Sequence, residues 1–238
     1  MKSFIRITLI LGLMLFIIHF GCSDNPSSST PTAGTVKISI KRASSATPMS
    51  SKKVVRNTTT SVTITSAHVV IKEIEFESVM GDTLDFEFEQ PFIQDLMVGS
   101  NLHEIETIEV PFGSYKKSEI KIDDLNPNDG AVYTQNPDLQ NRSILVRGFL
   151  NNDQNETFVF TSDLDKDQER EFEPPLVLDA NSPSTNIVLT LNMDTWFVDH
   201  NGDPLDPRDP SNKSIIENNI KDSIVVFEDK DDDGERDD

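Results

Sequence analysis

Residues 62–76 read VTITSAHVVIKEIEF, and this stretch decides the fold class. Apolar residues recur on one parity, and glutamates occupy the other parity at its C-terminal end. A period of two is that of a β-strand with one buried face, and like charges along the other face are tolerated only in solvent. The stretch therefore predicts a long strand with a core face and a solvent face. The apolar set is Val62, Ile64, Val70, Ile74 and Phe76, and the acidic set is Glu73, Glu75 and Glu77.

Further short apolar runs follow along the chain, each bounded by Asn, Asp, Gly or Pro. Such spacing is typical of a sandwich or barrel. We expect an all-β fold, an antiparallel β-sandwich over residues 35–228, with at most one or two short helices. A two-lobed body with a boundary near 126–141 is the alternative. One helix is expected after the capping residues 209–212, reaching Ile220. The other strands are expected at 35–41, 84–88, 92–98, 105–110, 115–122, 144–150, 157–160, 171–178, 187–191 and 224–227, and a loop is expected at 43–57.

The N-terminus has the pattern of a secretory signal. Lys2 and Arg6 precede an apolar run at 7–18, which is too short for a comfortable transmembrane helix and suits a signal peptide. The run ends just before Cys22, the only cysteine of the chain. Residues 1–21 resemble a bacterial lipoprotein signal peptide, which implies that Cys22 is acylated and becomes the first residue after cleavage. A plain N-terminal membrane anchor with an incidental cysteine is the alternative.

A linker rich in Ser, Thr and Pro follows the cysteine. Residues 22–34 contain almost nothing to bury, so we expect a flexible tether between the lipid and the folded body. Two or three acyl chains on one cysteine satisfy the rule that stable anchoring takes more than one chain. The expected location is the cell envelope, anchored by lipid in the outer membrane, with the periplasmic and surface faces both open.

Composition excludes several classes of function. The 238 residues contain 21 Lys and Arg against 41 Asp and Glu, a net charge of −20, which argues against a nucleic-acid partner. A single cysteine excludes a disulfide framework and a cysteine-based zinc site. The protein is therefore expected to be an acidic module with the membrane as one partner and an unknown protein or glycan as the other.

Several segments together resemble one family. They are GTVKISI, SAHVVIKEIEFES, FIQDLMVGSNLHEIETIEVPFGSYKKSEIKI and WFVDHNGDPLDP, behind a lipoprotein signal. The chain resembles an uncharacterised family of bacterial lipoproteins, a domain of unknown function with an immunoglobulin- or transthyretin-like β-sandwich. This resemblance implies that fold and brings no catalytic residues. The residues that carry it best are Asp95, Leu96, Gly99, Pro111, Gly113 and Tyr115.

The strongest local motif lies at the C-terminus, residues 229–238. Carboxylates at loop positions 1, 3, 5 and 9, a carbonyl at 7 and a glycine at 6 are what a calcium loop needs. The pattern resembles the calcium loops of thrombospondin type 3 repeats, and the chain carries no acid at position 12. A solvated acidic tail is the alternative. The expected metal ligands are Asp229, Asp231, Asp233, the carbonyl of Glu235, and Asp237.

Two further loops offer weaker candidates. Asp163, Asp165 and Asp167 share the spacing of the first three ligands, but a glutamine follows where a glycine is needed, which favours a plain charged loop. Trp196 precedes a loop containing Asp199 and Asp203. An aromatic ring beside polar groups suits a glycan, although such a ring more often closes a core.

Catalytic motifs are missing from the sequence. It has no HExxH pair, nucleophile elbow or phosphate-binding loop. We therefore expect no catalytic residue and predict a non-enzymatic binding or structural module, with calcium as its one candidate cofactor. An envelope hydrolase, or an accessory subunit of a polysaccharide-handling system, is the alternative, and it would need two carboxylates converging in a cleft.

Overall fold

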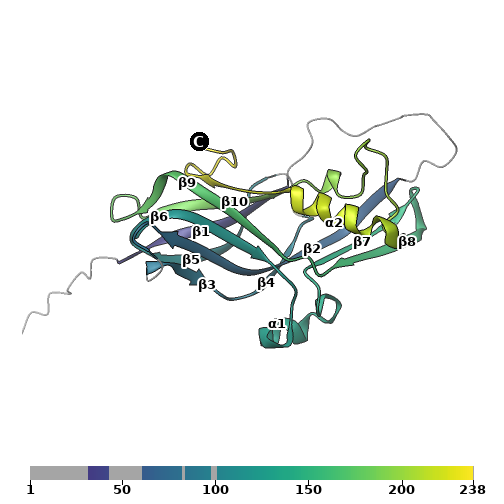
Figure 1. Cartoon of the computed structure of the whole chain (residues 1–238), viewed down its shortest axis with the longest axis horizontal. Helices are drawn as coiled ribbons and strands as arrows, with labels where there is room; N and C mark the ends of the chain where they lie inside the picture. The colour runs from purple at the N-terminus through teal and green to yellow at the C-terminus, as the bar shows by residue number, and fades with distance from the viewer. Residues whose placement is uncertain (1–31, 43–60, 82–83, 98–100, 238) are drawn as a thin grey trace, which may run out of the picture. The chain divides into compact units, whose positions relative to one another are not determined.

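The computed structural model describes residues 32–42, 61–81, 84–97 and 101–237 (Figure 1). Residues 31–238 form one compact unit. The predicted signal peptide, Cys22, most of the tether and the 43–57 loop lie outside the described residues. Within the described part, no helix has the length and apolar character needed to cross a membrane. The elements are β1 Ala33–Arg42, β2 Val62–Ser78, β3 Phe86–Phe88, β4 Phe92–Asp95, β5 His103–Pro111, β6 Gly113–Ile122, α1 Gly130–Gln135, β7 Ile144–Leu150, β8 Asp153–Ser162, β9 Lys166–Leu178, β10 Ser184–Leu191, α2 Lys213–Asp222 and β11 Ile224–Asp229, with short 3-10 turns at Pro127–Asp129, Pro137–Leu139, Met193–Thr195 and Pro210–Asn212.

The strands form two sheets, which confirms the prediction of an all-β sandwich. The first sheet has four strands in the order β11-β10-β1-β5. The second has seven, in the order β8-β7-β2-β6-β9, with β3 and β4 also paired to β2. β1 runs antiparallel to β5 and parallel to β10, with Thr35 opposite Ser184. Because of this parallel pairing, the first described strand lies beside β10, about 150 residues later in the chain, an arrangement that no local pattern predicts.

The long strand β2 changes the face that it presents to the core. Its pairing register shifts between Ile64 and Ser66 and again between Ile71 and Glu73. Each shift adds one unpaired residue and moves the following side chains to the opposite face. The prediction that one parity faces the core throughout is therefore wrong, and Val70 lies on the other face. The core-facing residues are Val62 and Ile64, then Ala67, Val69 and Ile71, then Ile74 and Phe76.

Residues 126–141, considered above as a boundary, fold into short helical turns within the single compact unit. Lys72, the extra residue of the second bulge, donates to both carboxylate oxygens of Asp129 at 2.5 and 2.6 Å. This partly buried ion pair holds the segment over β2. A small second apolar cluster lies beneath it, formed by Val70, Leu125, Leu139 and Leu145.

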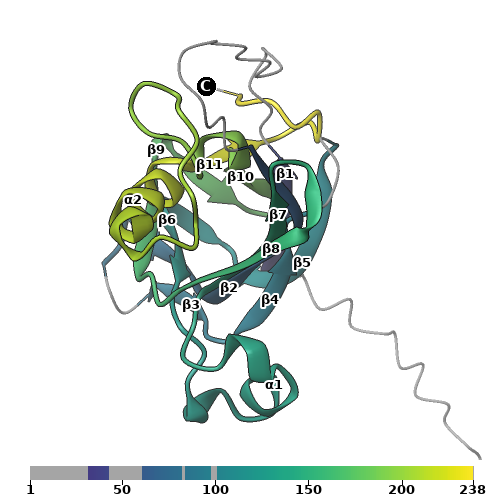
Figure 2. The ribbon, with the colours of Figure 1, turned by 90° about the vertical axis from the view of Figure 1, so that its right-hand side faces the viewer.

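The expected helix near the C-terminus is present as α2. The Asp209 carboxylate accepts from the Ser211 N–H at 2.9 Å and so caps the turn that leads into the helix. Ile216 and Ile220 are fully buried and pack into the main core. Figure 2 shows α1 and α2 on different sides of the sheets, so each covers a separate region of the strands.

Candidate metal site

The C-terminal residues fold back onto the first sheet. In β1, Val36, Ile38 and Ile40 face the main core, so the alternating Lys37 and Lys41 face the other side of the sheet. Both lysines form ion pairs with the segment that follows β11. Residues 230–233 and 235–237 are exposed to solvent, and the solvated tail stays an alternative to a metal site.

Two ion pairs hold the loop formed by residues 230–237. Lys37 Nζ lies 2.7 Å from Asp232 Oδ2. Lys41 Nζ donates to the Glu235 carboxylate and to the Gly234 carbonyl oxygen, both at 2.8 Å. Exposed pairs of this kind contribute little singly, about 0.2–1 kcal/mol each. Their effect here is positional, because they fix the loop against a rigid strand.

Three of the predicted ligand carboxylates come together in this loop. Asp229, Asp231 and Asp237 each offer one oxygen, and these oxygens lie within 4.8 Å of one another. Asp229 is fully buried and accepts from the Gly234 N–H at 2.8 Å and from the Asp233 N–H at 3.2 Å. The Asp237 carboxylate accepts from the Lys230 N–H. The cluster could therefore hold a metal ion.

The backbone of the loop has the tight curvature that its sequence requires. Gly234 has a φ of 78° and Asp232 a φ of 60°, both in the left-handed region. Glycine adopts that region without steric cost, and Asp tolerates it better than most residues. These two positions turn the chain so that Asp237 returns to Asp229 and Asp231.

The acids of the loop have different electrostatic surroundings. The pKa of Asp231 is raised, chiefly by the neighbouring charge of Asp233 and then by loss of hydration, with further repulsion from Asp237 and Asp229. The pKa of Asp232 is lowered, first by its hydrogen bond with Lys37. Asp232 therefore has its counter-charge, Lys37, within the protein, whereas the carboxylates of the cluster repel one another.

The carboxylates of Asp233 and Glu235 have other partners in the structure. Asp233 Oδ1 accepts from the Glu235 N–H at 2.7 Å, and Asp233 is outside the three-carboxylate cluster. The Glu235 carboxylate pairs with Lys41, whereas the group predicted as a ligand is its backbone carbonyl. The carboxylate cluster therefore contains three of the four carboxylates predicted from spacing, and the Glu235 carbonyl stays a prediction.

Sequence reasoning also missed three residues that contact the loop: Lys37, Lys41 and Asn186. Asn186 lies opposite Asp229 in the β10–β11 ladder and is 2% exposed. Its Nδ2 donates to Asp232 Oδ1 at 2.9 Å, and its Oδ1 has no hydrogen-bond partner within the described structure. A buried acceptor of this kind is costly unless it finds a partner. Asn186, Lys37 and Lys41 come near the loop because β1 pairs with β10. These strands are far apart in the sequence, so local patterns give no sign of the pairing.

The second candidate calcium loop has a different geometry. Asp163 lies 3.6 Å from Lys213 Nζ, and its pKa is lowered first by a hydrogen bond from the backbone and then by Lys213. Asp167 already belongs to β9, opposite Lys121 of β6. Among the described residues, Asp163, Asp165 and Asp167 form no cluster of close ligand atoms. Their surroundings are those of a charged loop leading into a strand.

The candidate glycan site also differs from the expectation. Trp196 is fully buried, and its Nε1 donates to Ser223 Oγ at 2.7 Å. The indole therefore presents no face to a ligand and has the core position considered as the alternative. Asp199 Oδ1 accepts from the N–H groups of Asn201 and Asp203, both at 2.8 Å, so this carboxylate holds a tight turn.

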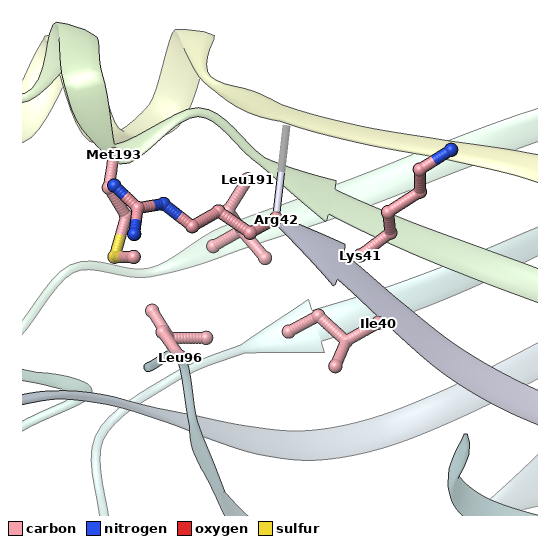
Figure 3. Close-up of a pocket in the computed structure, with 6 residues that line it drawn as sticks. All are labelled: Ile40, Lys41, Arg42, Leu96, Leu191 and Met193. Atoms are coloured by element: carbon pink, nitrogen blue, oxygen red, sulfur yellow. The ribbon is translucent and has the colours of Figure 1, made fainter. Parts of the chain in front are cut away.

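A small pocket lies where β1 ends, between the end of β10 and the residue after β4 (Figure 3). It encloses about 0 Å³ of space that a water-sized molecule could occupy, far below the roughly 300–1,000 Å³ of typical small-molecule sites. None of its lining residues is an acid, so the pocket does not supply the paired carboxylates of a glycosidase. The lining residues are Ile40, Lys41, Arg42, Leu96, Leu191 and Met193.

Comparison of the chain with family models, with curated proteins and with solved structures finds no match.

Proposed function

We propose that this protein is a lipid-anchored envelope module, non-enzymatic, whose C-terminal loop binds Ca²⁺. One observation carries the calcium proposal: the carboxylates of Asp229, Asp231 and Asp237 meet within 4.8 Å on a loop that is fixed to a sheet. The sequence of a lipoprotein signal followed by a tether supports the anchor.

The chemistry of the cluster favours calcium. Ca²⁺ takes six to eight oxygen ligands at about 2.3–2.6 Å, so oxygens on opposite sides of the ion lie about 4.8 Å apart. The three carboxylate oxygens lie within that limit of one another, so one ion could contact all of them. The Glu235 carbonyl at loop position 7 and the unpartnered Oδ1 of Asn186 are further oxygens close by in the chain or the sheet. The set is all oxygen, as a hard cation requires.

Calcium bound at this site would stabilise the first sheet. The ion would neutralise the repulsion that raises the pKa of Asp231. The same loop binds Lys37 and Lys41 of β1, while Asn186 of β10 binds Asp232. Fixing the loop therefore ties together β1, β10 and β11, which include the strand next to the anchor.

Calcium should raise the melting temperature of the full chain in detergent after removal of metal with a chelator. Extracellular calcium modules bind at about 10⁻⁴–10⁻³ M, so about 10 mM Ca²⁺ should add roughly 1.4–2.7 kcal/mol, or about 3–10 °C. Differential scanning calorimetry measures this shift directly. Magnesium at the same concentration should give a smaller shift, because it prefers a smaller octahedral shell and keeps its waters.

The double variant Asp231→Asn, Asp237→Asn should lose the calcium shift while keeping the fold, because both residues are exposed. The matched control is Asp165→Asn, Asp167→Asn, which removes the same charge from the other candidate loop. An equal calcium shift in the parent and in the Asp231, Asp237 variant would contradict the proposal. Loss of the shift in the control alone would assign the ion to the 163–167 loop.

The anchor has its own test. Cys22→Ala should abolish labelling by radioactive palmitate and leave an unprocessed precursor of higher mass, because acylation of the cysteine precedes cleavage in lipoprotein maturation. Ser23→Ala serves as the control and should be labelled like the parent. Labelling that persists in the Cys22 variant would contradict the lipoprotein proposal and favour a plain N-terminal membrane anchor.

A further inference from the structure

Several loops meet at the end of the sandwich where β1 begins. The Phe112 N–H donates to the Thr32 carbonyl oxygen at 2.9 Å, and the Val79 N–H donates to that of Ser114 at 3.0 Å. The Thr35 N–H donates to the Pro183 carbonyl oxygen at 2.7 Å. We call this region the tether end, made of the described residues 32–34, 79–81, 84, 111–114 and 177–184. In Figure 1, β8 lies at the opposite end from the loop joining β9 to β10.

The tether end exposes apolar side chains. Met80 is 75% exposed, Leu84 56%, Val177 47% and Val79 45%. These are four of the eight large hydrophobic residues that are exposed in the described part of the chain. Single exposed apolar residues are normal, whereas a gathering of them at one place marks an interaction surface.

The four residues are held close together by the backbone. The Val79 N–H donates to the Ser114 carbonyl oxygen, and Ser114 lies opposite Val177 in the β6–β9 ladder. The Leu84 N–H donates to the Gly81 carbonyl oxygen at 3.0 Å, which brings Leu84 back beside the turn that carries Met80. The apolar residues therefore form one patch across the ends of three strands.

Charge is sparse at the same end. In the sequence its loops carry three charged residues, Asp82, Asp85 and Asp179, in a chain of which 26% is charged. Asp179 Oδ1 accepts from the N–H groups of Asn181 and Ser182 at 2.7 and 2.8 Å, so this carboxylate is engaged in a turn. These loops account for −3 of the net charge of −20, and an anionic lipid surface would repel the faces that carry the rest.

Cys22 is close to this end along the chain. Thr32, where the described structure begins, is ten residues after Cys22. A fully extended segment of that length spans at most about 35 Å, about the thickness of one bilayer. Whatever path these residues take, acyl chains on Cys22 hold the tether end within that distance of the membrane surface.

We propose that the tether end rests on the bilayer, with Val79, Met80, Leu84 and Val177 inserted among the lipid headgroups. The proposal builds on the lipid anchor of the proposed function, and it adds an orientation. The acyl chains supply the affinity, and the apolar patch fixes which end faces the lipid. The opposite end of the sandwich, where β8 lies, is then directed away from the contact.

The test uses the acylated full chain in vesicles of phosphatidylethanolamine and phosphatidylglycerol. Acylation leaves Cys22 without a free thiol, so a second cysteine can be labelled alone with an environment-sensitive fluorophore. Met80→Cys probes the patch. Val159→Cys is the matched control, since Val159 is 60% exposed on β8. Val159 is paired with Arg147, which is paired with Ser66 of β2. Ser66 is 13 residues before Val79, about 40 Å along the strand, so the control position lies far from the patch.

Lipids brominated on their acyl chains should quench the label at position 80 and leave the label at position 159 unquenched. In the charged variant Met80→Asp, Leu84→Asp, a label at Val177→Cys should lose the quenching that it shows without those two changes. Flotation of the labelled protein with the vesicles reports the anchor separately.

Protein that floats while the label at position 80 stays unquenched would overturn the contact and leave the anchor standing. Protein that does not float would overturn both. A blue-shifted label at position 80 without quenching, dependent on protein concentration, would mean that a second copy of the chain covers the patch, and would also overturn the proposal.

Discussion

Gly148→Ala should destabilise the protein by about 3 kcal/mol or more, lowering the melting temperature by roughly 6–12 °C. A Cβ at this position would lie 2.0 Å from the Thr63 carbonyl oxygen and 2.7 Å from the Phe158 ring. Gly148 is buried in β7 and faces the core, where the ring of its cross-strand partner Phe158 covers it. Backbone on one side and a packed ring on the other leave no direction in which the new methyl group can move.

The crowding at Gly148 also involves the rest of the aromatic core. Phe158 packs edge-on against Phe197 with ring centroids 5.6 Å apart, so a shifted Phe158 would disturb its neighbour. Gly113→Ala is the control, because its nearest side-chain atoms would be at an ordinary 3.5 Å. Thermal melts followed by far-ultraviolet circular dichroism compare the two. A Gly148 variant that melts with the parent would show that the β2–β7 pairing differs from this structure.

Trp196→Ala should cost about 3–5 kcal/mol, the range for truncating a buried aromatic side chain. The indole is fully buried in the main core, and its Nε1 donates to Ser223 Oγ. Trp196→Phe is the matched variant, because it keeps most of the ring volume and loses the hydrogen bond, for a smaller cost of about 1 kcal/mol. Urea denaturation followed by circular dichroism gives both free energies.

The parent protein offers a second measurement at this site, since Trp196 is its only tryptophan. The folded protein should emit at short wavelength, shift to longer wavelength only on unfolding, and stay unchanged when a panel of glycans is added. A glycan-dependent shift in the folded protein, or a Trp196→Ala variant as stable as the parent, would contradict the core role and restore the ligand role.

Local patterns in the sequence were enough for the fold class and for most elements. Ile144–Leu150 is a strand with the expected bounds, and the Asp209 cap precedes a helix as expected. Residue-level packing in β2 was not predictable in the same way. The extra residues at Thr65 and Lys72 shift the register, and nothing in the alternation around them marks a bulge. Val70 was therefore assigned to the wrong face.

Of the candidate site, only the residues within the 229–237 segment could be predicted from the sequence. Spacing alone brought Asp229, Asp231 and Asp237 into one predicted set, because a glycine at position 6 turns the loop back on itself. The residues that hold the loop in place come from strands far away in the sequence. Lys37 and Asn186 meet Asp232 because β1 pairs with β10, and long-range pairing leaves no local signal.

The position of β1 also sets an order of events as the chain is made from its N-terminus. β1 lies between β5 and β10, so one of its edges stays open until Ser184–Leu191 have been added. Pairing between distant segments is slow, because the entropy cost of closing a long loop must be met before the stabilising contacts form. The first sheet is therefore completed only after β10 and β11 have been added. The loop of residues 230–237 contacts Lys37 and Lys41 of β1, so it acquires its form only after this sheet has assembled.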